Sequence, residues 1–294
     1  MKTALHSVSY AGVWPGQVTL PMERVIEKAA AFGYDGVMLM AKRPHASPLD
    51  LEEAARRRLR EAIESRGLAL VCLAGYTDFG AETPGIPFRE MQVLYVGELA
   101  RLARDLGGGL VRIFTAFERP NVSYRDAWAG CVAALKEAAR RAADFGVVLA
   151  VQNHHDLAVH HDAMFDLLAD VDEPNCRAAF DAWAPALHSV DLAAAVRKMA
   201  PFIVHTTVAD YQPRPRFTFY GPLSNYSPAP AAMRACPAGE GIIDYPTFFA
   251  ALREIGYDGC VAYEMCEMLT GGGSEENLDR CARHFLDWFR ALPR

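Results

Sequence analysis

Polar residues end several apolar runs of this sequence, and their chemistry is that of catalytic and metal-binding groups. The segment 149–156 reads LAVQNHHD, so an apolar run ends in five consecutive polar residues (152–156), two of which are histidines. Other runs are followed by Lys42 and His45, by Asp181 and Trp183, and by Glu264, while Arg112, His205 and Thr207 lie within or at the end of theirs. Carboxylate, amide and imidazole groups can ligate a divalent ion or transfer protons. Their function depends on whether the fold brings these run ends together.

Amphipathic segments and apolar runs alternate along the chain. A charged segment ending in Gly repeatedly precedes an apolar run, and the tetrapeptide GYDG occurs at 33–36 and again at 256–259. Glycine after a helix adopts the left-handed conformation at little cost, so this pattern indicates a helix followed by a strand. The runs lack polar alternation, which is typical of parallel strands covered on both faces. We expect strands over 3–9, 36–40, 68–74, 110–115, 147–153, 176–181, 202–208 and 260–265.

Eight strand–helix units within 294 residues predict an α/β protein with a single (β/α)₈ TIM barrel domain over 1–294. A doubly wound open sheet is the alternative, but no strand is followed by the GxGxxG motif of such folds. The segment 210–241 is rich in Pro, Tyr and Arg and predicts a long loop after the seventh strand. Such a loop would serve as a lid or substrate wall, or as a surface excursion or oligomer contact.

Composition and charge exclude several classes of function. The formal net charge is −6 and no long basic segment is present, so nucleic acid is not an expected partner. No run of about 18 apolar residues exists, so we expect no membrane span. The N-terminal segment lacks the features of a signal peptide, and the seven cysteines form no CxxC pair. Reduced thiols in a cytoplasmic protein explain this cysteine usage.

The C-terminal ends of all strands meet in one bowl in a (β/α)₈ barrel. Residues two apart on a strand face the same way, so Gln152, Asp181 and Glu264 would reach the bowl from neighbouring strands. The seventh strand would add His205 or Thr207. This set of oxygen and nitrogen atoms suits one divalent ion, with Mn²⁺, Mg²⁺, Fe²⁺, Co²⁺ and Zn²⁺ as candidates.

Two segments carry a resemblance to a known family: GEGIIDYPTFFAALREIGYDG (239–259), which precedes Glu264, and FDAWAP (180–185). Together with the polar strand ends they resemble the sugar phosphate isomerase/epimerase family of xylose isomerase-like TIM barrels. The resemblance covers nearly the whole chain. It implies a homo-oligomer and a divalent-metal site with Gln152, Asp181, a residue of the seventh strand and Glu264 as ligands.

Two positions depart from the family pattern. Family members typically have Glu where Gln152 stands, and Thr207 stands where they have His or Gln. We predict that His205, two residues earlier, reaches the ion from one layer deeper. Gln152 cannot serve as a base, which argues against a symmetrical epimerase with two opposed glutamates.

We therefore expect an isomerase or a dehydratase-like lyase acting on a sugar or sugar-derived keto compound through an enediolate. Glu264 would be the base, His154 or His45 a second proton-transfer group, and the ion a Lewis acid. The predicted substrate-binding residues are Lys42, His45, Arg112, His155, Trp183 and Arg216. The alternative is a metal-free, degenerate barrel that binds sugars or serves as a partner subunit.

Overall fold

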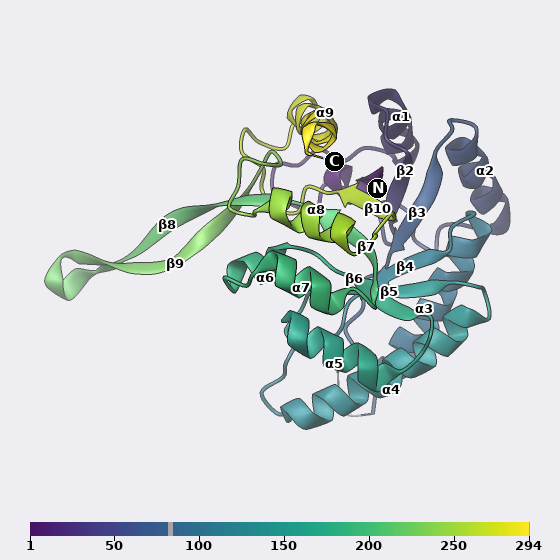
Figure 1. Ribbon diagram of the computed structural model, residues 1–294, viewed down its shortest axis with the longest axis horizontal. Coiled ribbons are helices and arrows are strands. Elements are labelled where there is room, and N and C mark those ends of the chain that lie inside the picture. Colours follow the sequence, from purple (N-terminus) through teal and green to yellow (C-terminus); the bar gives the residue numbers. More distant parts are fainter. Residues whose placement is uncertain (82–84, 294) are drawn as a thin grey trace.

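A closed barrel of eight parallel strands forms the centre of the computed structural model, which describes residues 1–81 and 85–293 (Figure 1). The strands follow one another around the barrel in the order β1-β10-β7-β6-β5-β4-β3-β2. Their bounds are β1 (Lys2–His6), β2 (Gly36–Met40), β3 (Ala69–Ala74), β4 (Leu110–Ile113), β5 (Val148–Gln152), β6 (Cys176–Ala179), β7 (Ile203–Val208) and β10 (Cys260–Tyr263). This architecture confirms the predicted TIM barrel.

Helices connect the strands and cover the outside of the barrel (Figure 1). They are α1 (Met22–Phe32), α2 (Glu53–Glu64), α3 (Phe88–Asp105), α4 (Tyr124–Ala143), α5 (His161–Val171), α6 (Trp183–Leu187), α7 (Leu192–Met199), α8 (Tyr245–Glu254) and α9 (Glu275–Ala291), with a short 3₁₀ turn η1 (Ser7–Tyr10) after β1. Gly33 ends α1 in the left-handed conformation, as its GYDG context predicted. Within the described residues, we find no helix of sufficient length and apolarity to span a bilayer.

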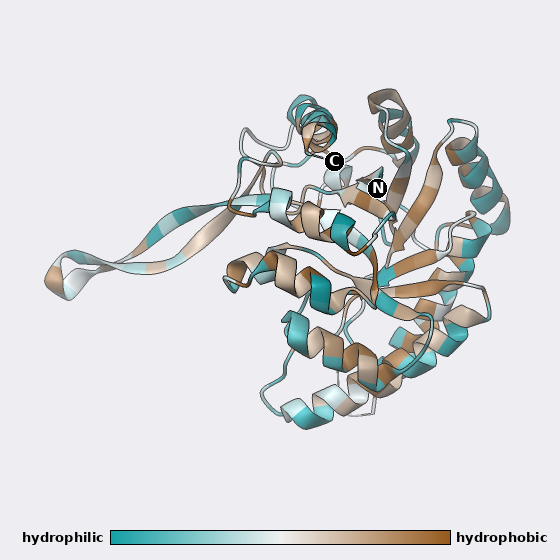
Figure 2. Cartoon of the chain, in the orientation of Figure 1, coloured by the Kyte–Doolittle hydropathy of each residue, from teal (hydrophilic) through white to brown (hydrophobic). Residues whose placement is uncertain are grey.

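Apolar side chains fill both the space between strands and helices and the lower part of the barrel interior. Figure 2 shows the strands as predominantly hydrophobic. Along a strand the interior changes from apolar to polar: Ala150 is followed two residues later by Gln152, and Ala262 by Glu264. The interior therefore presents polar groups at the C-terminal strand ends. The apolar cluster of the barrel interior consists of Ala4, Met38, Cys72, Ala74, Cys260 and Ala262. The seven cysteines of the chain are all free thiols.

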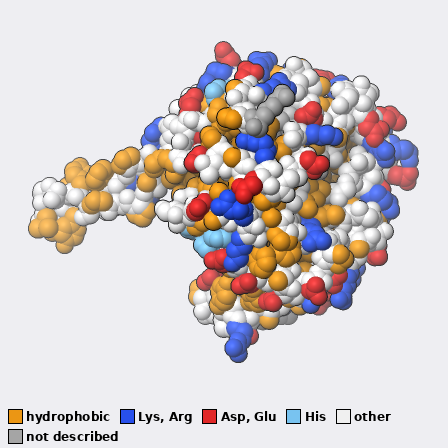
Figure 3. Space-filling model, in the orientation of Figure 1, with side chains coloured by type: hydrophobic (Ala, Val, Ile, Leu, Met, Phe, Trp, Pro, Cys, Tyr) orange, Lys and Arg blue, Asp and Glu red, His pale blue; other side chains and the backbone are white. Residues whose placement is uncertain are grey.

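The segment after β7 is a β-hairpin and not the long irregular loop that the sequence predicted. β8 (Asp210–Tyr220) and β9 (Asn225–Cys236) pair in antiparallel fashion around the tip η2 (Gly221–Leu223). The hairpin projects from the barrel as an arm on which hydrophobic side chains predominate (Figure 3). The sequence of this segment is rich in proline, which cannot donate a backbone hydrogen bond to a strand ladder. Proline is tolerated on edge strands, however, and both strands of a two-stranded ribbon are edges.

Asp210 holds the base of this arm. Its carboxylate accepts hydrogen bonds from the backbone N–H groups of Gly239 and Gly241, each at 2.9 Å. Gly241 is required by this close approach, because a Cβ atom there would lie 1.9 Å from Asp210 Oδ1. The turn before α8 therefore fixes the direction in which the arm leaves the barrel.

Helix α3 supports the strand ends through a close contact that a pair of leucine variants can test. Leu99 is fully buried and packs against Gly75 just beyond β3, whereas Leu94 on the same helix is 56% exposed. We expect Leu99→Ala to lower the free energy of unfolding by about 2–5 kcal/mol because it leaves a cavity. Leu94→Ala should change it by less than about 0.5 kcal/mol. Urea unfolding checks both values, and equal losses would contradict the assigned packing.

Candidate active site

The C-terminal strand ends enclose a cavity of about 180 Å³. It brings together Gln152, Asp181 and Glu264 from β5 and from the segments directly after β6 and β10. Thr207 of β7 lies among them, whereas His205 does not line this cavity. The full lining is Gln152, Asn153, His154, Asp181, Trp183, Thr207, Ala209, Tyr211, Met233, Tyr245, Glu264, Cys266 and Glu267.

The Asp181 carboxylate is surrounded by hydrogen-bond donors from two neighbouring strands. Thr207 donates its backbone N–H to Oδ1 at 2.7 Å and its hydroxyl to Oδ2. Gln152 donates its Nε2 amide hydrogen to Oδ2. Burial raises the pKa of Asp181, although the hydrogen bonds from Thr207 and Gln152 oppose this effect. Among the described residues, the buried Oε1 atom of Gln152 has no hydrogen-bond partner.

Asn153 fixes the backbone of Asp181. Its side-chain Nδ2 donates to the Asp181 carbonyl at 3.0 Å, and its Oδ1 accepts from the Asp181 N–H at 2.8 Å. Both groups are buried, so this paired contact replaces the strand ladder where β6 has already ended. Gln152, the last residue of β5, and Asn153 directly after it thus hold the side chain and the backbone of Asp181.

Glu264 is buried at the end of β10 and lies near a second acid. Burial and the charge of Asp181 raise the pKa of Glu264 to about 7. His6, the last residue of β1, places Nε2 at 3.7 Å from Glu264 Oε2. We had not selected His6 from the sequence, although it is a polar residue at the end of an apolar strand and so carried the same signal as the others.

A layer of basic side chains lies beneath the cavity, inside the barrel. His205 is fully buried, and burial followed by the charge of Arg112 lowers its pKa to about 3. Neither ring nitrogen of His205 has a hydrogen-bond partner among the described residues. The sequence predicted that His205 reaches the ion from one layer deeper. In the structure Thr207 contacts Asp181, and His205 lies below the residues that line the cavity.

Arg112 crosses the barrel interior on β4. It donates from Nη1 to the Gly75 carbonyl at 3.0 Å, and its guanidinium carbon lies 4.2 Å from the ring centroid of Phe114 and 5.0 Å from that of Tyr76. Its Nε is buried without a partner in the described chain. The positive charge of Arg112 partly offsets the two acids above it, because it lowers the pKa of Asp181 and of Glu264.

The two histidines of the opening motif lie at the rim of the cavity. His154 lines it, while His155 stacks on Phe117 with ring centroids 3.8 Å apart. The two Nδ1 atoms are 2.8 Å apart. Desolvation is the main cause that lowers the pKa of both imidazoles to about 4, and the charge of His155 contributes to the lowered pKa of His154. Both rings are therefore neutral near pH 7, which suits hydrogen bonding or proton acceptance.

Aromatic residues form the outer wall of the cavity. The ring of the predicted substrate contact Trp183 packs at a tilt against that of Tyr211, with ring centroids 4.0 Å apart. Tyr211 and Met233 come from the base of the arm, and Tyr245 from the start of α8. Sequence reasoning did not select these three residues. Tyr211 and Met233 follow from the hairpin, whose pairing the sequence did not predict.

Three other predicted substrate-binding residues lie outside the cavity lining. The ammonium of Lys42 lies 3.8 Å above the Tyr76 ring, and burial and Arg112 lower its pKa. His45 is buried, and its Nδ1 lies 3.0 Å from the hydroxyl of Ser7. Arg216 is exposed on the arm.

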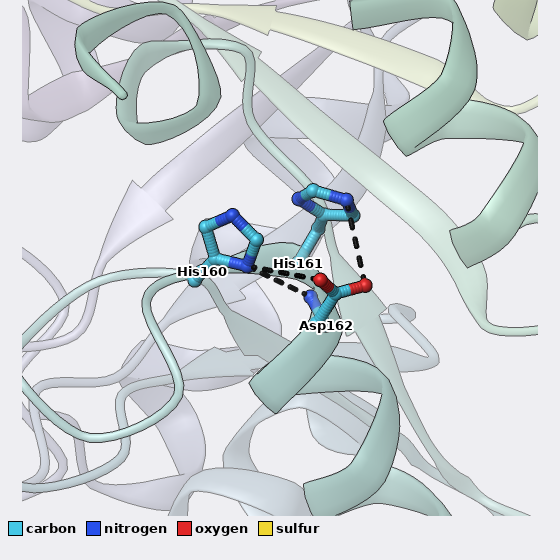
Figure 4. A group of neighbouring side chains, drawn as sticks. All are labelled: His160, His161 and Asp162. Carbon is cyan, nitrogen blue, oxygen red and sulfur yellow. Dashed lines mark hydrogen bonds and ion pairs between the residues drawn. The ribbon is translucent and has the colours of Figure 1, made fainter. Parts of the chain in front are cut away.

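A second cluster of metal-ligand types lies at the start of α5 (Figure 4). Among the described residues, His160, His161 and Asp162 bring their ligand atoms within 4.8 Å of one another. Two of the three have another role: His160 Nδ1 caps α5 by accepting from the Asp162 N–H at 3.3 Å, and the Asp162 carboxylate pairs with Lys198. The nearby Lys198 charge opposes a cation, so the cluster is explained by helix capping and an ion pair.

The donor set of the cavity fits a divalent cation. Two buried carboxylates converge there, and the proximity of Asp181 disfavours ionisation of Glu264. A cation would remove that repulsion. The unpartnered Oε1 of Gln152 supplies a neutral oxygen of the kind that Mg²⁺ and Mn²⁺ accept.

Fold and site together define a TIM-barrel protein with an acid-containing site at the C-terminal face of the barrel. The family model of the xylose isomerase-like TIM barrel matches residues 26–292, and the chain belongs to this family. The fructoselysine 3-epimerase of Shigella flexneri is 25% identical over 94% of this chain and 95% of its own length. These findings confirm the resemblance predicted from the sequence.

Solved structures share the fold over their whole length. The D-psicose 3-epimerase of Clostridium cellulolyticum H10 superimposes with a TM-score of 0.76 at 18% identity, covering 99% of each chain. The probable 3-DHS dehydratase AsbF of Bacillus anthracis does so with a TM-score of 0.74 at 17% identity, covering 100% of each.

The paired contact of Asn153 provides a test of how the site is held. Asn153→Ala leaves the buried N–H and C=O of Asp181 without partners, at a cost of about 1–3 kcal/mol for each group. We expect a clear loss of stability in urea unfolding. Asn121→Ala, at an exposed position, should be neutral. A stable Asn153→Ala variant would show that Asp181 is positioned in another way.

Proposed function

We propose that this protein is a divalent-metal-dependent isomerase or lyase that acts on a sugar or sugar-derived keto compound through an enediolate. The relatives are sugar epimerases and support an isomerase- or epimerase-like enzyme. The observation that carries the proposal is the convergence of Asp181 and Glu264 with the unpartnered Gln152 oxygen in one cavity. A cavity of this size supports a small-molecule substrate.

Asp181, Glu264 and Gln152 would hold the ion, with Thr207 or His205 adjoining them. When bound, the ion supplies Lewis-acid stabilisation for negative charge on adjacent substrate oxygens. Holding an ion requires Gln152 to present Oε1. Asp181 must also release part of its contact with the Thr207 hydroxyl, since its oxygens are engaged by protein donors.

Glu264 is the base in this proposal. Its carboxylate borders the cavity and takes the proton from the carbon next to the substrate carbonyl. Gln152 on the facing side has no proton-accepting group. The neutral imidazole of His154 at the rim is therefore the group that exchanges a proton with a substrate oxygen. Trp183 and Tyr211 offer an aromatic wall for a sugar ring.

The replacement of a second base by an amide separates this site from a symmetrical epimerase. One carboxylate and one imidazole support transfer of a proton between neighbouring atoms, or loss of water next to a carbonyl. An epimerase and a probable dehydratase both occur among the structures that share this fold. A cytoplasmic location and a homo-oligomeric state remain predictions from the sequence.

Metal content separates this proposal from the metal-free alternative. We expect about one Mn, Fe, Co, Zn or Mg per chain after dialysis against Mn²⁺ and removal of excess metal. Asp181→Asn and Glu264→Gln should reduce the bound metal at least tenfold, because each removes a ligand charge. Asp156→Asn, an exposed carboxylate beyond β5, should retain it. Wild-type protein without metal would support a degenerate sugar-binding barrel.

Proton exchange tests the role of Glu264. In D₂O, the metal-loaded enzyme should wash deuterium into a keto sugar such as fructose or psicose, detected as a one-unit mass increase. Glu264→Gln should slow exchange by about 10²–10⁴-fold, the usual contribution of general base catalysis. Glu276→Gln, which alters an exposed carboxylate on α9 outside the cavity lining, should stay within tenfold of wild type. Exchange at the wild-type rate in Glu264→Gln would exclude it as the base.

A further inference from the structure

The loop directly after β5 holds two histidines whose rings contact each other. His154 lines the cavity, and His155 is the next residue along the chain. The His155 backbone has a φ of 68°, in the left-handed region that residues with a side chain seldom adopt. In this conformation the His155 N–H turns back toward the preceding ring and donates to His154 Nδ1 at 2.7 Å. Strained backbone of this kind is concentrated at functional sites, where the surrounding structure maintains it.

Neighbouring side chains hold this loop in place. The His155 ring stacks on Phe117, with an angle of 17° between the two planes. The Thr115 hydroxyl donates to the Leu157 carbonyl at 2.6 Å and lies 3.1 Å from the His154 carbonyl oxygen, so one side chain anchors both ends of the turn. The loop after β5 is therefore fastened to the segment after β4, and the two imidazoles have little freedom to rearrange.

The backbone hydrogen bond fixes where His154 carries its hydrogen. An amide N–H can only donate, so His154 Nδ1 must offer its lone pair and carries no hydrogen. His155 Nδ1 lies 2.8 Å from the same atom and can approach that lone pair only as a second donor. Turning the His154 ring over would place a C–H group against these donors, so the network selects one orientation. A neutral His154 therefore has its hydrogen on Nε2.

We infer that His154 presents an N–H donor from Nε2 to the substrate, and that His155 is the positioning residue that maintains this tautomer. This role of His154 rests on the proposed function and specifies the direction in which the proton moves there. Because Nδ1 is occupied, Nε2 is the remaining polar atom of a ring that borders the cavity. Exchange of a proton with a substrate oxygen thus begins with donation by His154, and acceptance by this ring can only follow.

The tautomer complements the role of Glu264. When Glu264 takes the proton from the carbon next to the carbonyl, the electron pair of the broken C–H bond forms a carbon–carbon double bond. The π pair of the carbonyl then moves onto its oxygen, and a neutral imidazole N–H can stabilise the negative charge that develops there. Return of the proton from Glu264 to a carbon of the enediolate restores a carbonyl. One base and one donor are sufficient for this reaction, without a second base at Gln152.

Nuclear magnetic resonance of the full chain labelled with ¹⁵N-histidine tests the tautomer without reference to activity. With diamagnetic Mg²⁺ present near pH 7, we expect His154 Nδ1 to be unprotonated and Nε2 to be protonated. We also expect a ¹⁵N–¹⁵N coupling across the hydrogen bond from the His155 amide to Nδ1. The signals are assigned by their loss in His154→Gln. A proton on Nδ1, alone or together with one on Nε2, would overturn the inference.

Two substitutions at His155 test its positioning role in the same spectrum. His155→Gly accepts the left-handed backbone and keeps its N–H, so the coupling to His154 Nδ1 should persist. His155→Val resists this backbone conformation because its side chain is β-branched, so the coupling should disappear. Loss of the coupling in His155→Gly, or its retention in His155→Val, would show that the His155 backbone does not maintain the tautomer.

Two substitutions at His154 test the donor role. His154→Gln retains an amide N–H donor but cannot accept a proton, whereas His154→Leu has neither property. In the deuterium exchange with fructose or psicose, His154→Leu should be slower than wild type by about 10²–10³-fold, the usual effect of removing one such donor. His154→Gln should exchange at least about tenfold faster than His154→Leu. His188→Gln, at an exposed position outside the cavity lining, should match wild type. Equal losses in the two His154 variants would overturn the donor role.

The two measurements distinguish failure of the tautomer from failure of the proposed function. A wild type that exchanges no deuterium counts against the proposed function, while the spectrum still decides the tautomer. Exchange by the wild type together with a proton on His154 Nδ1 overturns the tautomer alone. Thermal unfolding confirms that each variant retains a folded barrel.

Discussion

The buried carboxylate of Asp181 is the group around which the site is built. A carboxylate taken out of water is stable only with hydrogen bonds or a cation beside it. Gln152 and Thr207 supply the hydrogen bonds from the strands on either side, and Asn153 holds the backbone. These contacts tie β5, β6 and β7 together at their C-terminal ends, and they position the acid toward Glu264. The position of each neighbour follows from the need to keep this one charge in the interior.

The barrel makes that arrangement possible by changing its lining along its axis. Small apolar residues fill the lower interior, and acids, amides and imidazoles occupy the end where the bowl opens. Arg112 lies between these regions and lowers the electrostatic cost of two acids, while burial and the charge of Asp181 still raise the pKa of Glu264 to about 7. Several interior polar atoms are unpartnered in the described chain, those of His6, His205 and Gln152 among them. An interior of this kind is suited to a polar occupant.

Much of the fold and part of the site could be predicted from the sequence because their signals are local. Glycine after a helix and unbroken apolar runs indicated the strand–helix units, and residue parity brought Gln152, Asp181 and Glu264 to one bowl. The arm could not be predicted, since its strands contain prolines and its aromatic face is exposed, and Tyr211 and Met233 of the site come from it. The choice between His205 and Thr207 and the position of His45 depend on packing depth and loop direction. The spacing of residues along the sequence determines neither packing depth nor loop direction.

The most direct measurement is the anomalous scattering of manganese in crystals grown with Mn²⁺. The account predicts one strong peak in the cavity, within ligand distance of Asp181 and Glu264, with the Gln152 amide turned so that its oxygen faces the ion. A strong peak at His160, His161 and Asp162 with none in the cavity would contradict it. Well-occupied crystals without any peak would contradict it equally.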